Sequence, residues 1–149
     1  MDLGFWLLFL HLIGAAIWVG GHLVLMIGIL PQALGARDPA PVLAFEAAYE
    51  RIGMPALAVQ VVTGLWLALR LAPDPSTWLD LADPVARGIL LKLALLAATA
   101  ALALHARLVV IPRIDGRRLP VLAAHVAGVT LIAVAFVWTG LSFRFGGIG

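Results

Sequence analysis

One stretch decides the fold class: residues 119–143, LPVLAAHVAGVTLIAVAFVWTGLSF, contain no Asp, Glu, Lys or Arg. A transmembrane helix needs about 20 consecutive, mostly apolar residues. Three further stretches reach this length with few charges: residues 5–30, 52–72 and 84–111. The sequence therefore predicts an all-α integral membrane protein, a four-helix bundle formed by a single transmembrane domain over residues 1–149.

The composition supports this prediction and excludes several other classes of protein. The chain is 63% hydrophobic and 12% charged, with a mean hydropathy of +1.07, whereas soluble domains average roughly 45–50% apolar and about 25% charged residues. The absence of cysteine excludes a disulfide scaffold, thiolate metal sites and a cysteine nucleophile. Ten Lys and Arg against eight Asp and Glu give a net charge of +2, which predicts charged loops and no nucleic-acid partner.

Prolines mark the ends of the predicted spans. Asp83 followed by Pro84 is typical of a helix N-cap with proline at the first helical position, where the missing N–H costs nothing. Pro31 is expected to stop the first span, and residues 41–51 predict a short interfacial helix between the first two spans. A cleaved signal peptide is the alternative for residues 5–30, but no Lys or Arg precedes this run and it is longer than a signal core.

The arginines predict how the protein sits in the membrane. Four spans place both termini on one side, and cytoplasmic loops carry an excess of Lys and Arg. The side without the termini holds six basic residues, whereas the side with the termini holds four. We therefore expect both termini on the non-cytoplasmic side. The six are Arg37, Arg51, Arg107, Arg113, Arg117 and Arg118, and the four are Arg70, Arg87, Lys92 and Arg144.

All four histidines fall inside predicted spans, where ionisable residues are costly and usually functional. A rise of about 1.5 Å per residue places His22, His105 and His125 at one level near the predicted cytoplasmic side. The same count places His11 nearer the other side, at a depth similar to that of Lys92. Imidazoles from three helices at one depth predict a metal or cofactor site, with all four histidines as candidate ligands.

Small residues lie beside these histidines. Ala94, Ala98 and Ala101 precede His105 at helical spacing, and Gly128 follows His125 by one turn. Such faces leave room for a flat macrocycle between helices, but they also let membrane helices pack closely without any cofactor. Neutral imidazole suits haem iron, copper and zinc alike, so the residue type does not select the metal.

Two basic residues are candidate partners for an anion. Lys92 either extends its flexible stem toward the headgroups or faces the bundle, where it would hold a haem propionate or a substrate carboxylate. Arg107 is a second candidate for a propionate, and its alternative role is that of an ordinary cytoplasmic anchor.

Two segments resemble a known family. HLIGAAIWVGG, from His11 to Gly21, resembles the first helix of the CopD-type (copper-resistance protein D) membrane family. RGILLKLAL, beginning at Arg87 and followed by Arg107 and Pro112-Arg113, resembles its later helix pair. The related HemJ-type protoporphyrinogen oxidases, four-span proteins with b-type haem, share a His…Trp…Gly first helix and a Lys followed by a His in the third. This resemblance implies a bacterial-type inner (cytoplasmic) membrane protein.

The chain departs from these families at three histidines. His22 stands where an apolar residue is usual, and His125 stands where CopD-like chains often carry an acidic residue. His105 lies thirteen residues after Lys92, farther than in the oxidases. These departures favour a metal- or haem-centred variant over porphyrinogen oxidation.

Three functions follow as hypotheses. The first is a small b-type cytochrome whose haem b is held by paired histidines from His22, His105 and His125, with His11, Lys92 and Arg107 lining the cofactor region. Such a protein would be a membrane oxidoreductase or electron carrier, with a quinone or a redox protein as partner. The alternative is a copper-binding or copper-transport protein of the CopD type, with Met26 or Met54 as a soft ligand. The third is a structural bundle in a larger complex. We also expect a homo-oligomer.

Overall fold

We describe residues 2–148 of a computed structural model of the chain. This part of the chain is helical, contains no strand, and forms four helical spans that are long and apolar enough to cross a membrane. The predicted all-α, four-span fold is confirmed, and the chain is a multi-pass membrane protein. The first span consists of α1 (Leu3–Leu23), η1 (Val24–Ile29) and α2 (Leu30–Ala36), and the second span consists of α3 (Ala40–Leu71). The third span consists of α4 (Pro84–His105), η3 (Ala106–Val110) and η4 (Ile111–Arg113). The fourth span consists of α5 (Leu119–Ser142) and η5 (Phe143–Phe145).

Two predicted boundaries differ from the structure. Residues 41–51 do not form a separate interfacial helix, because α3 runs without a break from Ala40 to Leu71. Pro55 lies inside this helix and removes only one backbone hydrogen bond, the one to the carbonyl of Arg51. The first span likewise continues past Pro31 into α2, since a proline in the first turn of a helix is tolerated.

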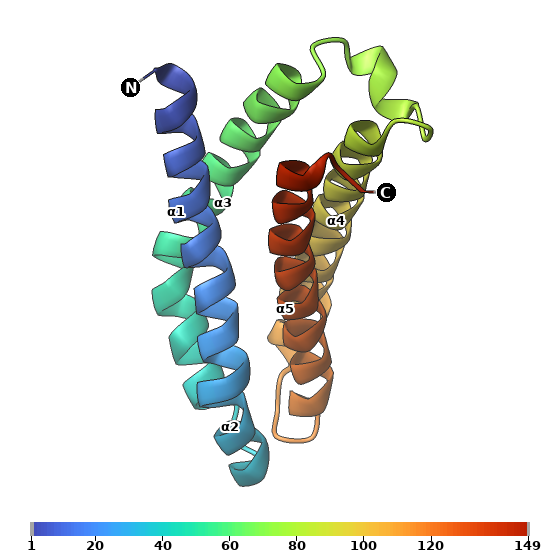
Figure 1. Cartoon of the computed structure of the whole chain (residues 1–149). Coiled ribbons are helices and arrows are strands. Elements are labelled where there is room, and N and C mark those ends of the chain that lie inside the picture. The colour runs from blue at the N-terminus through green and yellow to red at the C-terminus, as the bar shows by residue number, and fades with distance from the viewer. Residues whose placement is uncertain (1, 149) are drawn as a thin grey trace.

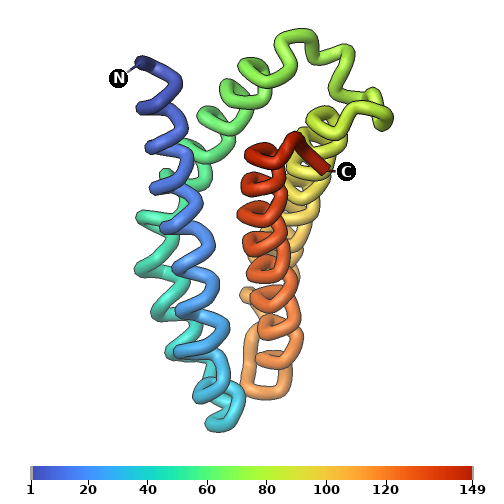
Figure 2. The backbone as a smooth tube through the Cα atoms, in the orientation of Figure 1, coloured from blue at the N-terminus to red at the C-terminus, as the bar shows by residue number. Residues whose placement is uncertain are grey.

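The four spans form two pairs. α1 packs against α3, α4 packs against α5, and α1 and α5 join the two pairs, whereas α3 and α4 make almost no contact. Figure 1 shows the pairs close together at the end that carries α2 and farther apart at the end where both chain termini lie. The backbone trace in Figure 2 shows the same divergence. We call these the α2 end and the terminal end.

A buried apolar cluster holds the α2 end together. Its residues come from all four spans, so each span is anchored there to the others. Burying apolar side chains against one another is what fixes helix positions at this end. The cluster consists of Leu25, Leu30, Ala33, Val42, Val110, Leu119, Leu122 and Val126.

Polar contacts fix the terminal end. The carboxylate of Asp83 accepts a hydrogen bond from the backbone N–H of Val85 and caps α4, as its position before Pro84 predicts. The guanidinium of Arg87 donates to the carbonyl oxygen of Ile148 from Nε at 2.8 Å and from Nη2 at 2.6 Å. Its Nη1 atom donates to the carbonyl of Leu81, in the connection that contains η2 (Pro75–Leu79). Arg87 thus ties both flanking segments to the start of α4.

Candidate functional site

The structure brings His105 and His125 into direct contact. His105 is the last residue of α4, and His125 lies near the start of α5, its neighbour in the helix pair. The Nδ1 atom of His105 is 2.8 Å from the Nε2 atom of His125. The two rings are stacked, with centroids 4.9 Å apart and planes inclined by 8°. Two of the histidines predicted at one depth therefore form a pair.

Hydrogen bonding fixes the protons on this pair. The Nδ1 atom of His125 is 2.8 Å from the carbonyl oxygen of Val121, which can only accept. A neutral imidazole has one N–H, so His125 carries it on Nδ1 and accepts at Nε2 from the Nδ1–H of His105. The remaining lone pair is on Nε2 of His105, for which the described residues supply no hydrogen-bond partner. A histidine that ligates a metal usually donates its other N–H in this way.

His22 has the same proton arrangement in a different place. Its Nδ1 atom lies 2.8 Å from the carbonyl oxygen of Trp18, so Nδ1 donates and Nε2 keeps the lone pair. The ring lies against the indole of Trp18, 4.6 Å between centroids, and edge-on to Tyr49 of α3 at 6.1 Å. The hydroxyl of Tyr49 donates to the carbonyl of Ile17. His22 is therefore held in the α1–α3 pair.

His11 belongs to a polar network between α1 and α3. Its Nδ1 atom is 2.9 Å from Oγ1 of Thr63, and that hydroxyl donates to the carbonyl of Val59 at 2.6 Å. Because the hydroxyl proton is already used, His11 donates from Nδ1, and Nε2 again keeps its lone pair. The side-chain amide of Gln60 donates to the backbone carbonyl of His11.

The predicted group of three histidines does not form. Within residues 2–148, no group of three or more His, Cys, Asp or Glu side chains is placed to hold a metal ion. The depth of a residue fixes only its position along the membrane normal. His22 is turned toward Tyr49 in one helix pair, whereas His105 and His125 meet in the other.

The side chain of Lys92 projects from α4 and lies against the C-terminal part of the fourth span. Its Nζ atom is 5.5 Å from the centroid of the Phe143 ring, a cation–π geometry. A Cβ atom added at Gly140 would lie 3.3 Å from Nζ, so this glycine leaves room for the ammonium group. The side chain extends toward the terminal end. No carboxylate in the described residues forms a salt bridge with it, and its predicted role in holding an anion remains a prediction.

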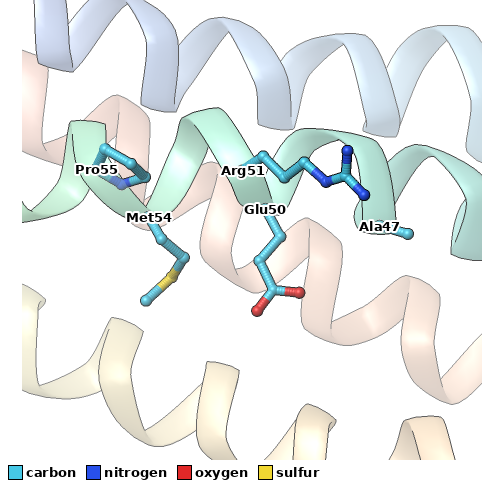
Figure 3. A pocket seen from close by; sticks show the side chains of 5 residues that line it. All are labelled: Ala47, Glu50, Arg51, Met54 and Pro55. Atoms are coloured by element: carbon cyan, nitrogen blue, oxygen red, sulfur yellow. The ribbon is translucent and has the colours of Figure 1, made fainter.

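Arg107 has a partner that the sequence did not suggest. Its Nη1 atom is 2.6 Å from Oε1 of Glu50, which links the third span to α3. Beside this ion pair, a pocket of about 580 Å³ is lined by α3 residues that include Glu50, Arg51 and Met54. Figure 3 shows Glu50 and Met54 projecting from the same side of α3. The acidic side chain within the second helix was the signal that could have identified this contact.

Two π-helical segments were also missed. η1 begins two residues after His22, and η3 begins directly after His105. A π-helical turn is wider than an α-helical one and is frequent at functional sites. No sequence pattern distinguishes the residues of these two segments from those of an ordinary helix.

These observations define the class of the protein: a multi-pass helical membrane protein with a pair of imidazoles at one end of its bundle. The model of the family "Copper resistance protein D" (CopD) matches residues 43–141, and the chain belongs to this family. The matched residues include the histidine pair, Lys92 and Arg107, but not the first-helix segment from His11 to Gly21. No curated protein and no solved structure matches the chain.

Proposed function

We propose that this protein handles copper within the membrane and that the His105–His125 pair receives the ion as cargo. The observation that carries the proposal is the open lone pair on Nε2 of His105, within the residues that match the copper-resistance family. Imidazole is a good ligand for copper, and the hydrogen bond from Nδ1–H orients the ring for binding through Nε2.

The proton arrangement suits an incoming cation. Each imidazole keeps its proton on Nδ1, so no proton has to leave before Nε2 of His105 binds. If the ring of His105 turns away from His125, Nε2 of His125 also becomes available. One ion can then be held by two imidazoles from adjacent helices. Thioethers such as Met26 and Met54 belong to the ligand types that select Cu(I), but neither is placed in the pair by any contact described above.

Haem b, the first expectation from the sequence, fits this arrangement poorly. Paired axial histidines approach the iron from opposite faces of the macrocycle and must stand apart to admit it. His105 and His125 instead form a direct hydrogen bond with stacked rings. His22, the third candidate ligand, is held by Trp18 in the other helix pair. The family match supports the copper alternative and gives no support to haem.

The test is copper binding by the purified protein in lipid nanodiscs, under reducing conditions, with bound metal measured by mass spectrometry. We expect His105→Ala and His125→Ala each to weaken copper binding at least about tenfold, since even residues that only orient a ligand cost this much. His11→Ala is the matched control, because His11 also lies within a span but in a separate network. Undiminished binding by the doubly substituted protein, or a Soret band in the wild type, would overturn the proposal.

We further propose that the protein resides in a bacterial-type inner membrane with both termini outside the cytoplasm. The support is the excess of arginine in and near the connections of the α2 end. In this orientation the histidine pair lies in the half of the bundle nearer the cytoplasm. A quinone or a redox protein as partner has no support in the contacts described above.

A further inference from the structure

A groove of about 370 Å³ lies between α1 and α3. Four residues of α1 and five of α3 line it, and Arg51 is the one charged residue among them. Its floor contains Gly14 and Ala56, which are buried, and its sides contain Leu10 and Ile52, which are exposed. In a membrane-spanning chain, exposed apolar side chains of this kind face the lipid tails. The groove therefore opens to the bilayer.

The two helices approach closely at the floor of the groove. A Cβ atom added at Gly14 would lie 3.0 Å from Cγ of Gln60 and 3.1 Å from the backbone carbonyl oxygen of Ala56. Small residues let membrane helices come this close together. The longer side chains on both sides then stand above the floor, so the shape of the groove follows from the packing of α1 against α3.

Arg51 has no anionic partner within the described part of the chain. Glu50 is its neighbour in sequence, but Figure 3 shows the two side chains leaving α3 in different directions. Glu50 is paired with Arg107, and this is the only salt bridge within residues 2–148. An unpaired charge in a membrane span is costly and is usually matched by an opposite charge. The anion for Arg51 has to come from its surroundings.

The position of Arg51 along α3 brings it within reach of lipid phosphates. Arg70, at the other end of α3, lies 5.0 Å from the ring of Trp66, and both residue types are common at membrane interfaces. Arg51 and Arg70 are about 28 Å apart along the helix, and the hydrocarbon core is about 30 Å thick. Arg51 therefore lies just inside the opposite edge of the hydrocarbon, and its flexible stem carries the guanidinium to the headgroups. From Arg51 the groove extends about 12 Å toward the terminal end, as far as Val59.

Pro55 adds a hydrogen-bond acceptor at the same place. It has no N–H, so the carbonyl oxygen of Arg51 loses the donor that it would have in a regular helix. Arg51 and Pro55 both line the groove, so a cation and a carbonyl acceptor lie together at one end of it. A phosphate with a hydroxylated headgroup complements both, since the phosphate accepts from a guanidinium and a hydroxyl donates to a carbonyl.

We propose that this groove binds one anionic phospholipid with a glycerol headgroup. Its phosphate pairs with Arg51, a headgroup hydroxyl donates to the carbonyl of Arg51, and one acyl chain lies between α1 and α3. A zwitterionic lipid fits less well, because its own ammonium group already balances the phosphate. A neutral quinone would leave the charge of Arg51 unbalanced. The site is separate from the His105–His125 pair and does not depend on the proposed copper function.

The headgroup is tested by native mass spectrometry of the protein released from nanodiscs that contain phosphatidylglycerol and phosphatidylcholine with the same acyl chains. We expect each wild-type chain to retain one phosphatidylglycerol molecule, and we expect Arg51→Gln to weaken this retention at least about tenfold. Arg113→Gln is the matched control, since it removes the same charge from an exposed arginine outside the groove. Equal loss in the two variants, or no preference of the wild type for phosphatidylglycerol, would overturn the proposal.

The acyl chain is tested by filling the groove. Val59 lines the groove far from Arg51, so we expect Val59→Phe to weaken the retention of phosphatidylglycerol severalfold although the guanidinium remains. Val62→Phe is the matched control, because Val62 is an exposed residue of α3 that does not line the groove. Undiminished retention by Val59→Phe would overturn the groove as the binding site.

Discussion

Arg107 and Glu50 form an ion pair that joins the third span to α3, with 2.6 Å between Nη1 of Arg107 and Oε1 of Glu50. The third span and α3 make almost no other contact. Both side chains are well exposed, at 66% and 46%. Both residues lie within membrane spans, so the surface that they leave open faces the bilayer, where screening by water and salt is weak. The pair therefore stabilises the contact between α3 and the third span more than a solvent-exposed ion pair would.

The first prediction concerns the strength of this ion pair. In a double-mutant cycle with Glu50→Gln and Arg107→Gln, we expect a coupling above the roughly 1 kcal/mol of a solvent-exposed pair, and we expect it to change little as salt is added. The measurement is reversible unfolding in mixed micelles at two salt concentrations. A coupling below about 1 kcal/mol that falls as salt is added would show that the pair is open to water.

The second prediction concerns two neighbouring glycines of α1. A Cβ atom at Gly21 would collide with the ring of Tyr49, whereas a Cβ atom at Gly20 would meet nothing within 4 Å. We expect Gly21→Ala to destabilise the protein by about 1–3 kcal/mol, the usual cost of overpacking. Gly20→Ala is the matched control, and it should be neutral or slightly stabilising because alanine is the better helix former. Unfolding curves of the two variants provide the comparison, and equal stability would contradict the close contact of Tyr49 with α1.

The third prediction concerns the C-terminal segment. Arg87 holds the carbonyl of Ile148 through two donors, and Ile148 in turn donates its N–H to the carbonyl of Pro84. We expect Arg87→Ala to increase amide hydrogen exchange after η5 while leaving exchange in α1 unchanged. Arg144→Ala is a suitable control, since Arg144 is exposed and makes none of these contacts. Similar exchange in Arg87→Ala and the wild type would show that the backbone contact with Pro84 suffices.

The fourth prediction concerns topology. If the positive-inside rule applies, a reporter that is active only outside the cytoplasm should be active at the C-terminus and inactive in the connection at residues 114–118. Replacing Arg113, Arg117 and Arg118 with glutamine should reduce this asymmetry. The reverse pattern of reporter activity would place the histidine pair near the outer surface.

The four spans could be predicted from the sequence because their signal is local. Residues 119–143 contain no charge, and Asp83-Pro84 marks the start of α4 by its own chemistry. The continuity of α3 could not be predicted, because a proline inside a helix either kinks it or ends it and the residues around Pro55 do not show which. The same holds for Pro31, which the first span passes without ending.

The candidate site could be predicted only in part. Counting residues placed His105 and His125 at one depth, and the structure shows them in contact. Which of the histidines at this depth contact one another depends also on how each helix is rotated about its own axis. Spans that are apolar on every side carry little information about which side faces a neighbour. This is why His22, at the same expected depth, contacts Trp18 and Tyr49 instead.

The position of the protons on the imidazoles has an electrical consequence. Because His105 and His125 keep their protons on Nδ1, a cation that binds at Nε2 adds its full charge to the membrane interior without displacing a proton. Moving one elementary charge through the whole membrane potential involves about 2.3 kcal/mol per 100 mV. Loading of the histidine pair would therefore be electrogenic, and the free energy of binding would change with voltage in proportion to the fraction of the membrane field that the ion has crossed.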